Sequence, residues 1–332
     1  MAVIVPADAA HISLAVRVLR EGGVVAMPTE TVYGLAADAT NDDAVRRIFT
    51  TKGRPADHPV IVHIASSAAI DDWAVEVPPE ARRLAHAFWP GPLTLVLKRA
   101  AHVSDLITGG QATVGLRCPA HPVAQALLAA LAEHHRPSGL AAPSANPFGR
   151  ISPTSAWHVA ADHPASDLLV LDGGECGFGI ESTIIDASRM ATDGLVLLRP
   201  GALDVEPLAA SAGAPIHRRL AAHGQAPRVS GALASHYAPR KPLRLVRPDE
   251  LKAVSESDAA RYAVLTIATE LPAHPWAWSM HAENDPHTYA HGLYAWLRAM
   301  DASTASQLLV EWPPAMPEWD AVHDRLRRAA TA

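Results

Sequence analysis

Short apolar segments that alternate with helix-like stretches constrain the fold of this chain more than any other feature. Residues 24–27, 59–65, 93–99 and 113–117 are rich in Val, Ile and Leu and have the length of buried strands. Apolar residues recur at helical spacing in four other stretches, 11–21, 41–50, 78–88 and 122–133. The N-terminal part is therefore predicted to be α/β of the α+β type, with helices flanking a twisted sheet.

The pattern changes after residue 211. Residues 212–241 are rich in Gly, Pro, His, Arg and Ser and show no periodicity, which is typical of a linker. Strand-like and helix-like stretches then alternate up to a last helix near 317–330, which favours a small α/β unit with a mainly parallel sheet. The predicted organisation is a first domain over 1–211, a linker over 212–241 and a C-terminal domain over 242–332.

Charge and cysteine content exclude several classes of protein. The formal net charge is −6, which argues against a basic nucleic-acid platform. The chain has two cysteines, Cys118 and Cys176, and their spacing is not that of metal ligands. The N-terminus lacks the charged region of a signal peptide, and no apolar run is long enough to span a membrane. These features predict a cytoplasmic protein.

Residues 28–40, PTETVYGLAADAT, place hydroxyls and a carboxylate directly after a buried-looking strand. In an extended chain Thr29, Thr31 and Tyr33 would line one face. Gly34 follows, where the backbone can turn or approach a ligand. Two readings remain open from this stretch alone: one wall of a ligand site, or a polar edge strand.

Several basic residues are candidates for anion binding. Lys52 and Arg54 flank a glycine after a predicted helix, and an ammonium and a guanidinium together suit a polyphosphate. A solvated turn is the alternative. Arg117 ends an otherwise apolar strand that begins at Thr113, and it needs an anionic partner if it is buried, either a substrate carboxylate or a structural Asp or Glu. Arg199 ends a later strand and is a further phosphate candidate.

Polar residues in loops complete the candidates. Ser144, Asn146 and Ser152 belong to a Pro-rich loop that suits ligand contacts, although turn chemistry also explains them. His287 and His291 have helical spacing, but no third metal ligand is evident, which favours a solvated helix face. The glycine-rich phosphate loops and the GxSxG elbow are not found.

A series of motifs in this order resembles the YrdC/YciO family across residues 10–205. The motifs are PTETVYGLAADAT, KGRPADHPVIVHI, WPGPLTLVL, VGLRCPAHP, APSANPFGRISPT, LDGG followed by GIESTIID, and LLRPG. The segment SGALASHYAP and the unit after it resemble the two-domain branch of that family. The resemblance implies a mostly β N-terminal fold with a concave, positively lined cleft.

The resemblance also implies L-threonylcarbamoyladenylate synthase activity. Such enzymes join L-threonine, bicarbonate or CO2, and ATP with Mg²⁺, and release pyrophosphate. Downstream proteins then transfer the threonylcarbamoyl group to the adenosine beside the anticodon of tRNA. The family pattern implies threonine binding by Thr31, His63, Arg117 and Ser182. It implies ATP binding by Lys52, Arg54, His58, Thr113, Ser144, Asn146, Ser152, Arg199 and Tyr237, and position 58 departs from the family's usual Asn.

The mechanism expected from these residues relies on positioning and charge. Lys52 and Arg54 would stabilise charge on the phosphates, and His63 is the hypothetical acceptor of the threonine ammonium proton. The linker with Tyr237 would close over a labile carbamate. Two rival readings are an RNA-binding module with the same cleft and no chemistry, and an enzyme of the same fold acting on another substrate such as carbamoyl phosphate.

Overall fold

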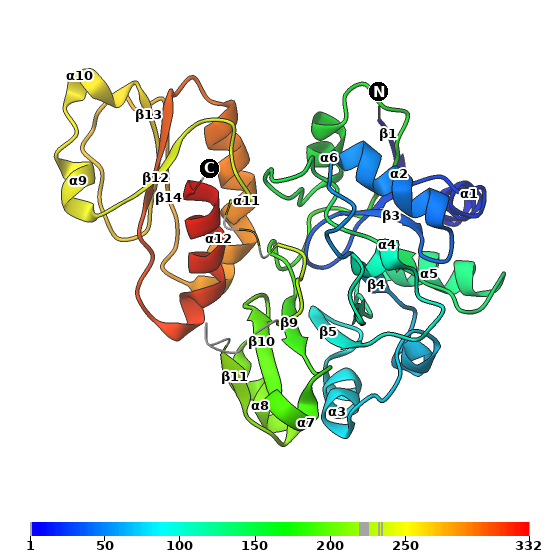
Figure 1. Cartoon of the computed structure of the whole chain (residues 1–332). Coiled ribbons are helices and arrows are strands. Elements are labelled where there is room, and N and C mark those ends of the chain that lie inside the picture. Colours follow the sequence, from blue (N-terminus) through cyan, green and yellow to red (C-terminus); the bar gives the residue numbers. More distant parts are fainter. Residues whose placement is uncertain (1, 219–225, 232, 234, 332) are drawn as a thin grey trace. The chain divides into compact units, whose positions relative to one another are not determined.

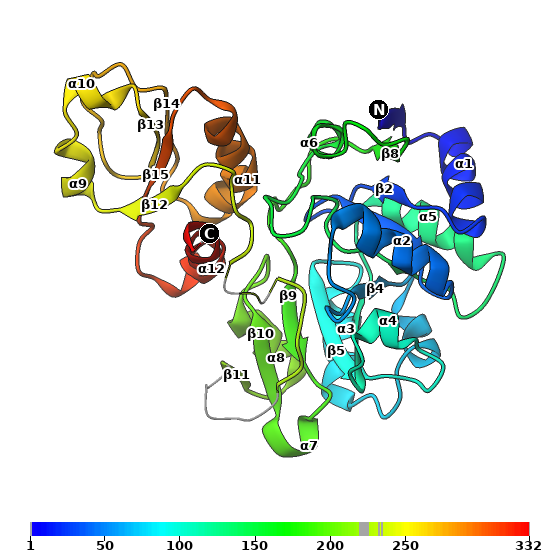
Figure 2. The same cartoon turned by 45° about the horizontal axis from the view of Figure 1, so that its top comes forward.

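The computed structural model describes residues 2–218, 226–231, 233 and 235–331 (Figures 1 and 2). The chain divides into two compact units. The first contains Met1–Phe148 and Pro153–Ala232, and the second contains Gly149–Ser152 and Leu233–Ala332. The predicted linker over 212–241 lies partly outside the described residues, and its boundaries stay a prediction. Its described part includes strand β11 (Ile216–Arg218).

In the described part of the first unit, eleven strands form one sheet in the order β1-β8-β2-β3-β7-β4-β6-β5-β9-β10-β11. Parallel and antiparallel pairs both occur, so the sheet is mixed. The other strands of this sheet are β1 (Val3–Pro6), β2 (Val25–Met27), β3 (Gly34–Asp38), β4 (Ile61–His63), β5 (Leu93–Lys98), β6 (Thr113–Arg117), β7 (Leu140–Ala141), β8 (Leu169–Asp172), β9 (Thr183–Asp186) and β10 (Leu195–Arg199).

Helices flank this sheet, and their ends follow from local sequence (Figure 2). They are α1 (Ala9–Arg20), α2 (Asp42–Lys52), the 3₁₀ helix η1 (Ser67–Asp72), α3 (Pro79–Phe88), α4 (Asp105–Thr108), α5 (Pro122–Ala132), α6 (Ala156–Asp162), α7 (Met190–Asp193) and α8 (Val205–Ala212). The side chain of Asn41 caps α2 by accepting from two backbone N–H groups. Gly53 ends α2 in the left-handed conformation, which turns the chain directly after Lys52.

The two faces of the central strands have different environments. Val62 and Leu116 are fully buried in the larger hydrophobic cluster, with residues of α2, α3 and α4. Because side chains alternate along a strand, Ile61 and Gly115 lie on the opposite face, where both line a small cavity. The apolar pattern of these strands therefore buries one face and leaves the other available for polar residues.

Helices α1 and α5 cover only part of this second face. His63 pairs with Leu140 on one side and with Arg117 on the other, so the three side chains share a face. Leu140 packs in a hydrophobic cluster with residues of α1 and α5. The face is thus apolar and helix-covered over β2, β3 and β7, and becomes polar over β4, β6, β5 and β9.

The second unit contains a four-stranded sheet in the order β12-β15-β13-β14, and every pair is parallel, as predicted. Its elements are β12 (Leu243–Val246), α9 (Pro248–Lys252), α10 (Glu256–Ala259), β13 (Tyr262–Thr266), β14 (Trp278–His281), α11 (Pro286–Ala302), β15 (Gln307–Glu311), the 3₁₀ helix η2 (Pro317–Trp319) and α12 (Asp320–Ala330). The carboxylate of Glu311 accepts from the backbone N–H groups of residues 267, 268 and 269, which satisfies a buried charge. None of the described helices is long and apolar enough to cross a membrane.

Candidate active site

The segment PTETVY is a loop, not a strand. It connects the antiparallel strands β2 and β3, so the predicted extended hydroxyl face is wrong. The hydroxyl of Thr29 donates to the carbonyl of Val32 (2.6 Å) and lies 2.9 Å from the hydroxyl of Thr31. Tyr33 points elsewhere and donates to the carbonyl of Gly174 (2.8 Å). The local turn chemistry of Thr29 competes with sheet pairing and sets this conformation.

Thr31 and Arg117 meet at the end of this loop. Nη1 of Arg117 donates to the hydroxyl of Thr31 (2.8 Å), and its Nε donates to the carbonyl of Gly91 (3.4 Å). Nη2 of the same guanidinium lies 2.7 Å from a carboxylate oxygen of Glu30. The side chains of Arg117 and Glu30 are only 5% and 11% exposed, so this is a buried ion pair. The anionic partner that Arg117 requires is thus supplied by the chain itself.

His63 stands beside Arg117 on the neighbouring strand, directly paired with it. Burial lowers the pKa of His63 to about 3, and the positive charge of Arg117 contributes to the shift. Its Nδ1 has no hydrogen-bond partner among the described residues. The ring is therefore neutral near pH 7.

Ser182 and Arg199 form a second group on the same face. Nε and Nη2 of Arg199 donate to the carbonyl of Ser182 (3.1 and 2.9 Å), and Nη2 also donates to its hydroxyl (3.1 Å). The hydroxyl of Ser182 lies 2.7 Å from that of Thr94 on β5. Thr94 in turn pairs with Ile184 on β9, two residues beyond Ser182. Arg199 therefore fixes the loop that carries Ser182.

Residues 228–230 lie over this face and connect the two predicted phosphate-binding arginines. Nη1 of Arg199 donates to the carbonyl of Ser230 (2.9 Å), and Nη2 of Arg54 donates to its hydroxyl (3.4 Å). The Ser230 hydroxyl donates to the carbonyl of Pro59 (2.9 Å). The space left beneath this segment is about 20 Å³, and Thr113 lines it. That volume is close to the size of one water molecule.

Lys52 is buried at the end of α2, and its exposed fraction is 4%. Its ammonium donates to the carbonyls of Ser144 and Asn146, so the structure brings these three predicted residues together. Burial lowers the pKa of Lys52 well below its usual value, and the charge of Arg54 adds to the effect. The side-chain amide of Asn146 donates to the carbonyl of Pro147 (2.8 Å). A nearby anion would favour the charged form of Lys52.

Phe148 provides a common aromatic platform for Arg54 and His58. The guanidinium of Arg54 lies 5.8 Å from the ring centre of Phe148, and the ring of His58 meets it edge-on at 5.4 Å. Burial lowers the pKa of His58, and the charge of Arg54 lowers it further. His58 therefore lies beside Arg54, one of the predicted phosphate ligands, as a neutral ring.

Two predicted residues belong to the second unit, Ser152 and Tyr237. Both are buried, and the carbonyl of Ser152 accepts from Arg298 (3.4 Å). Tyr237 has φ of 61°, stacks on Tyr294 at 5.6 Å and lies beneath the guanidinium of Arg325 at 5.3 Å. Both residues are fixed within the second unit.

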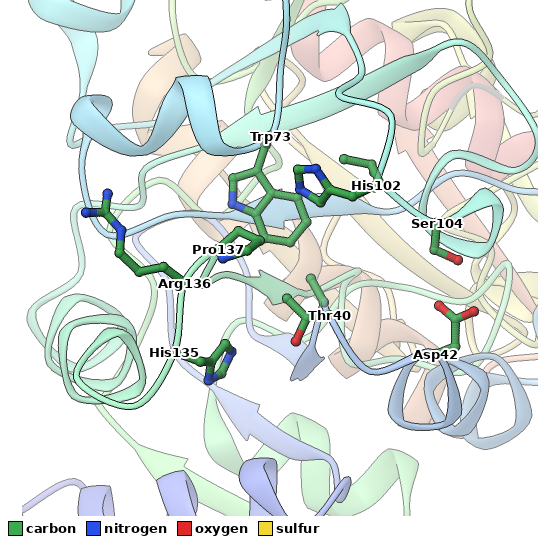
Figure 3. A pocket seen from close by; sticks show the side chains of 10 residues that line it. Thr40, Asp42, Trp73, His102, Ser104, His135, Arg136 and Pro137 are labelled. Atoms are coloured by element: carbon green, nitrogen blue, oxygen red, sulfur yellow. The ribbon is translucent and has the colours of Figure 1, made fainter.

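A separate hollow of about 670 Å³ lies elsewhere in the first unit (Figure 3). It is lined by Ala39, Thr40, Asp42, Trp73, His102, Val103, Ser104, His135, Arg136 and Pro137. None of these belongs to the predicted site. Among the described residues, no group of three or more His, Cys, Asp or Glu side chains is arranged to hold a metal ion.

Two family models match the chain and together cover nearly all of it. A model of the Sua5, YciO and YrdC proteins, described as "Telomere recombination", matches residues 17–201. A second, described as "Threonylcarbamoyl-AMP synthase, C-terminal domain", matches residues 203–331. The chain belongs to the Sua5/YciO/YrdC family. The first model covers most of the part of the chain that forms the large sheet, and the second covers the C-terminal domain.

Relatives in the Sua5/YciO/YrdC family match the chain over most of its length. A protein of Pyrococcus abyssi named threonylcarbamoyl-AMP synthase is 39% identical, and the match covers 96% of this chain and 94% of the relative. A Bacillus subtilis protein of the same name is also 39% identical, with coverage of 96% and 93%. The structure of P. abyssi Sua5 complexed with L-threonine matches with a TM-score of 0.85 at 38% identity, covering 100% of this chain and 97% of that one.

Sequence reasoning about this Sua5/YciO/YrdC member missed three residues of the site. Glu30 stands between two threonines that drew attention for their hydroxyls, and the signal for it was that Arg117, if buried, needs an anionic partner. Thr94 was hidden inside an apolar strand. Ser230 was hidden in the unpatterned segment, where no periodicity marks a contact with a sheet.

Proposed function

We propose that this chain is an L-threonylcarbamoyladenylate synthase, which joins L-threonine, bicarbonate or CO2, and ATP to give threonylcarbamoyl-AMP and pyrophosphate. The proposal rests on one observation: a single face of the sheet carries two different groups of polar side chains. A buried arginine with hydroxyl and imidazole neighbours suits an amino acid, and two other arginines joined through Ser230 suit phosphates. The near full-length identity to relatives named for this activity supports the same assignment.

Arg117 holds the threonine carboxylate in this proposal, because its guanidinium is buried and forked. Thr31, His63 and Ser182 complete the amino-acid end. His63 is neutral there, so its ring can hydrogen-bond to the substrate, and it stays the proposed acceptor of the ammonium proton. Hydroxyl recognition by such groups discriminates against amino acids that lack the threonine hydroxyl.

The cationic side chains Lys52, Arg54 and Arg199 bind the ATP phosphates. His58, Thr113, Ser144, Asn146, Ser152 and Tyr237 are the remaining proposed ATP contacts. Mg²⁺ enters as part of the MgATP substrate, held by phosphate oxygens and water. The cations stabilise the charge that develops when the carbamate oxygen attacks the α-phosphorus and pyrophosphate leaves. Lys52, desolvated in the free protein, gains an anionic partner when the ATP phosphates bind.

Water exclusion protects the carbamate, which is labile. Residues 228–230 lie over the sheet face and bond to both phosphate-binding arginines, so this segment is suited to sense the phosphates. We place the reaction in the cytoplasm, with the product passed to proteins that modify tRNA. The proposal includes at most a weak direct contact with tRNA, and the RNA-binding module without chemistry is not favoured.

Pyrophosphate release from MgATP tests the proposed function. L-threonine and bicarbonate are each omitted in turn, and serine replaces threonine in a further reaction. Release that requires both threonine and bicarbonate is the expected result. Release that ignores threonine, or no release from well-folded protein, would overturn the proposal, and RNA binding with its salt dependence would then be measured.

A further inference from the structure

Glu30 is a buried carboxylate at the amino-acid end of the site, and the proposed roles leave it without a function. One of its oxygens lies 2.7 Å from Nη2 of Arg117, the guanidinium that also donates to Thr31. Neither carboxylate oxygen accepts a hydrogen bond from a described residue. The contact with Arg117 is therefore one of charge with charge, without good hydrogen-bond geometry.

A carboxylate in this state is costly to the fold. Burying a charge is tolerated when the charge is both paired and hydrogen-bonded, and Glu30 meets only the first condition. Three other described side chains interact electrostatically with Glu30, and none of the three supplies a positive charge. Burial keeps His121 neutral by lowering its pKa, and it raises the pKa of the thiols of Cys118 and Cys176. The carboxylate thus retains the capacity to accept hydrogen bonds from a cationic ligand.

We infer that Glu30 binds the α-ammonium group of the amino-acid substrate, so that the Glu30–Arg117 pair recognises a zwitterion. This inference rests on the proposed function. An amino acid carries its carboxylate and its ammonium on one carbon atom, and the pair offers one group of opposite charge to each. Insertion of the substrate between the two side chains exchanges one ion pair for two, while the net charge of the buried region stays zero.

The pair thereby sets specificity as well as affinity. A ligand with the threonine carboxylate and hydroxyl but no amine would separate Arg117 from Glu30 without supplying a positive charge to pair with Glu30. An uncompensated buried carboxylate is strongly unfavourable, so such a ligand is rejected. Thr31 and Arg117 alone would not provide this discrimination, because they contact groups that both ligands share.

The test is calorimetric binding of L-threonine and of (R)-3-hydroxybutanoate, which keeps the carboxylate and hydroxyl of threonine and lacks the amine. In Glu30→Gln, we expect threonine to bind at least tenfold more weakly, and the hydroxy acid to bind no more weakly than it does to the unaltered chain. Glu76→Gln is the matched control, since Glu76 is an exposed carboxylate that pairs with Lys98. It should leave both affinities unchanged.

A purely structural role for Glu30 predicts a different result. If Glu30 only holds Arg117 in place, both ligands lose affinity by the same factor in Glu30→Gln, and that outcome overturns the inference. If Glu30→Gln does not fold, Glu30→Asp is used, and equal losses for both ligands again refute it. Should the unaltered chain prefer another amino acid, the proposed function fails, and Glu30 is still tested with that amino acid and its deaminated analogue.

Discussion

Replacing Arg117 with methionine is expected to lower the free energy of unfolding of the first unit by about 3–5 kcal/mol. The variant keeps a similar side-chain volume but leaves Glu30 as a buried charge without its partner, which lies 2.7 Å away in the native chain. In the double variant Glu30→Gln/Arg117→Met both charges are absent. The double variant should therefore lose less free energy of unfolding than the two single variants do in sum, by at least about 1 kcal/mol.

An exposed pair in the same unit provides the control. Arg82 and Asp71 are also 2.7 Å apart, but their side chains are 49% and 64% exposed. Arg82→Met should cost less than about 1 kcal/mol because water screens that pair. Urea unfolding followed by hydrogen exchange in peptides of β4 and β6 reports the first unit separately. Equal losses for the two Arg→Met variants, or additive losses in the cycle, would refute the argument from burial.

Three further predictions concern the other charged groups. The pKa of His63 is about 3 in the folded chain and near 6.5 in the unfolded chain. Below pH 6.5 the free energy of unfolding of the native chain should therefore fall, relative to that of His63→Gln, by about 1.4 kcal/mol per pH unit. The same pH dependence of this free energy in both proteins between pH 7 and 5 would contradict the prediction. Binding of MgATP should take up protons, because burial lowers the pKa of Lys52 in the free chain and phosphate charge favours its ammonium form. The binding enthalpy would then depend on the buffer, and this dependence should persist in the control Lys98→Met and be lost in Lys52→Met. Arg199→Lys should speed hydrogen exchange in residues 226–231 at least tenfold, since an ammonium cannot reproduce the forked contacts to Ser182 and Ser230; unchanged exchange would count against that anchoring role.

Much of the fold was readable from local pattern. The strands at 59–65, 93–99 and 113–117 and the helix that begins near residue 41 follow from apolar spacing and capping chemistry, which act over a few residues. The parallel sheet of the second unit followed from alternation of strand and helix. The loop at 28–33 was misread because Thr and Tyr favour strands in general, whereas here the Thr29 hydroxyl closes a turn.

The sequence by itself determined which residues carry charge and hydroxyl groups, and the resemblance of its motifs indicated their ligands. Only the tertiary structure decided which of them meet. Arg117 and Glu30 are far apart in the chain, and Ser230 connects Arg199 with Arg54. Such contacts depend on strand order and on a segment without periodicity, and neither leaves a local signal. The low pKa values of His63 and Lys52 arise for the same reason, because burial by distant segments sets them.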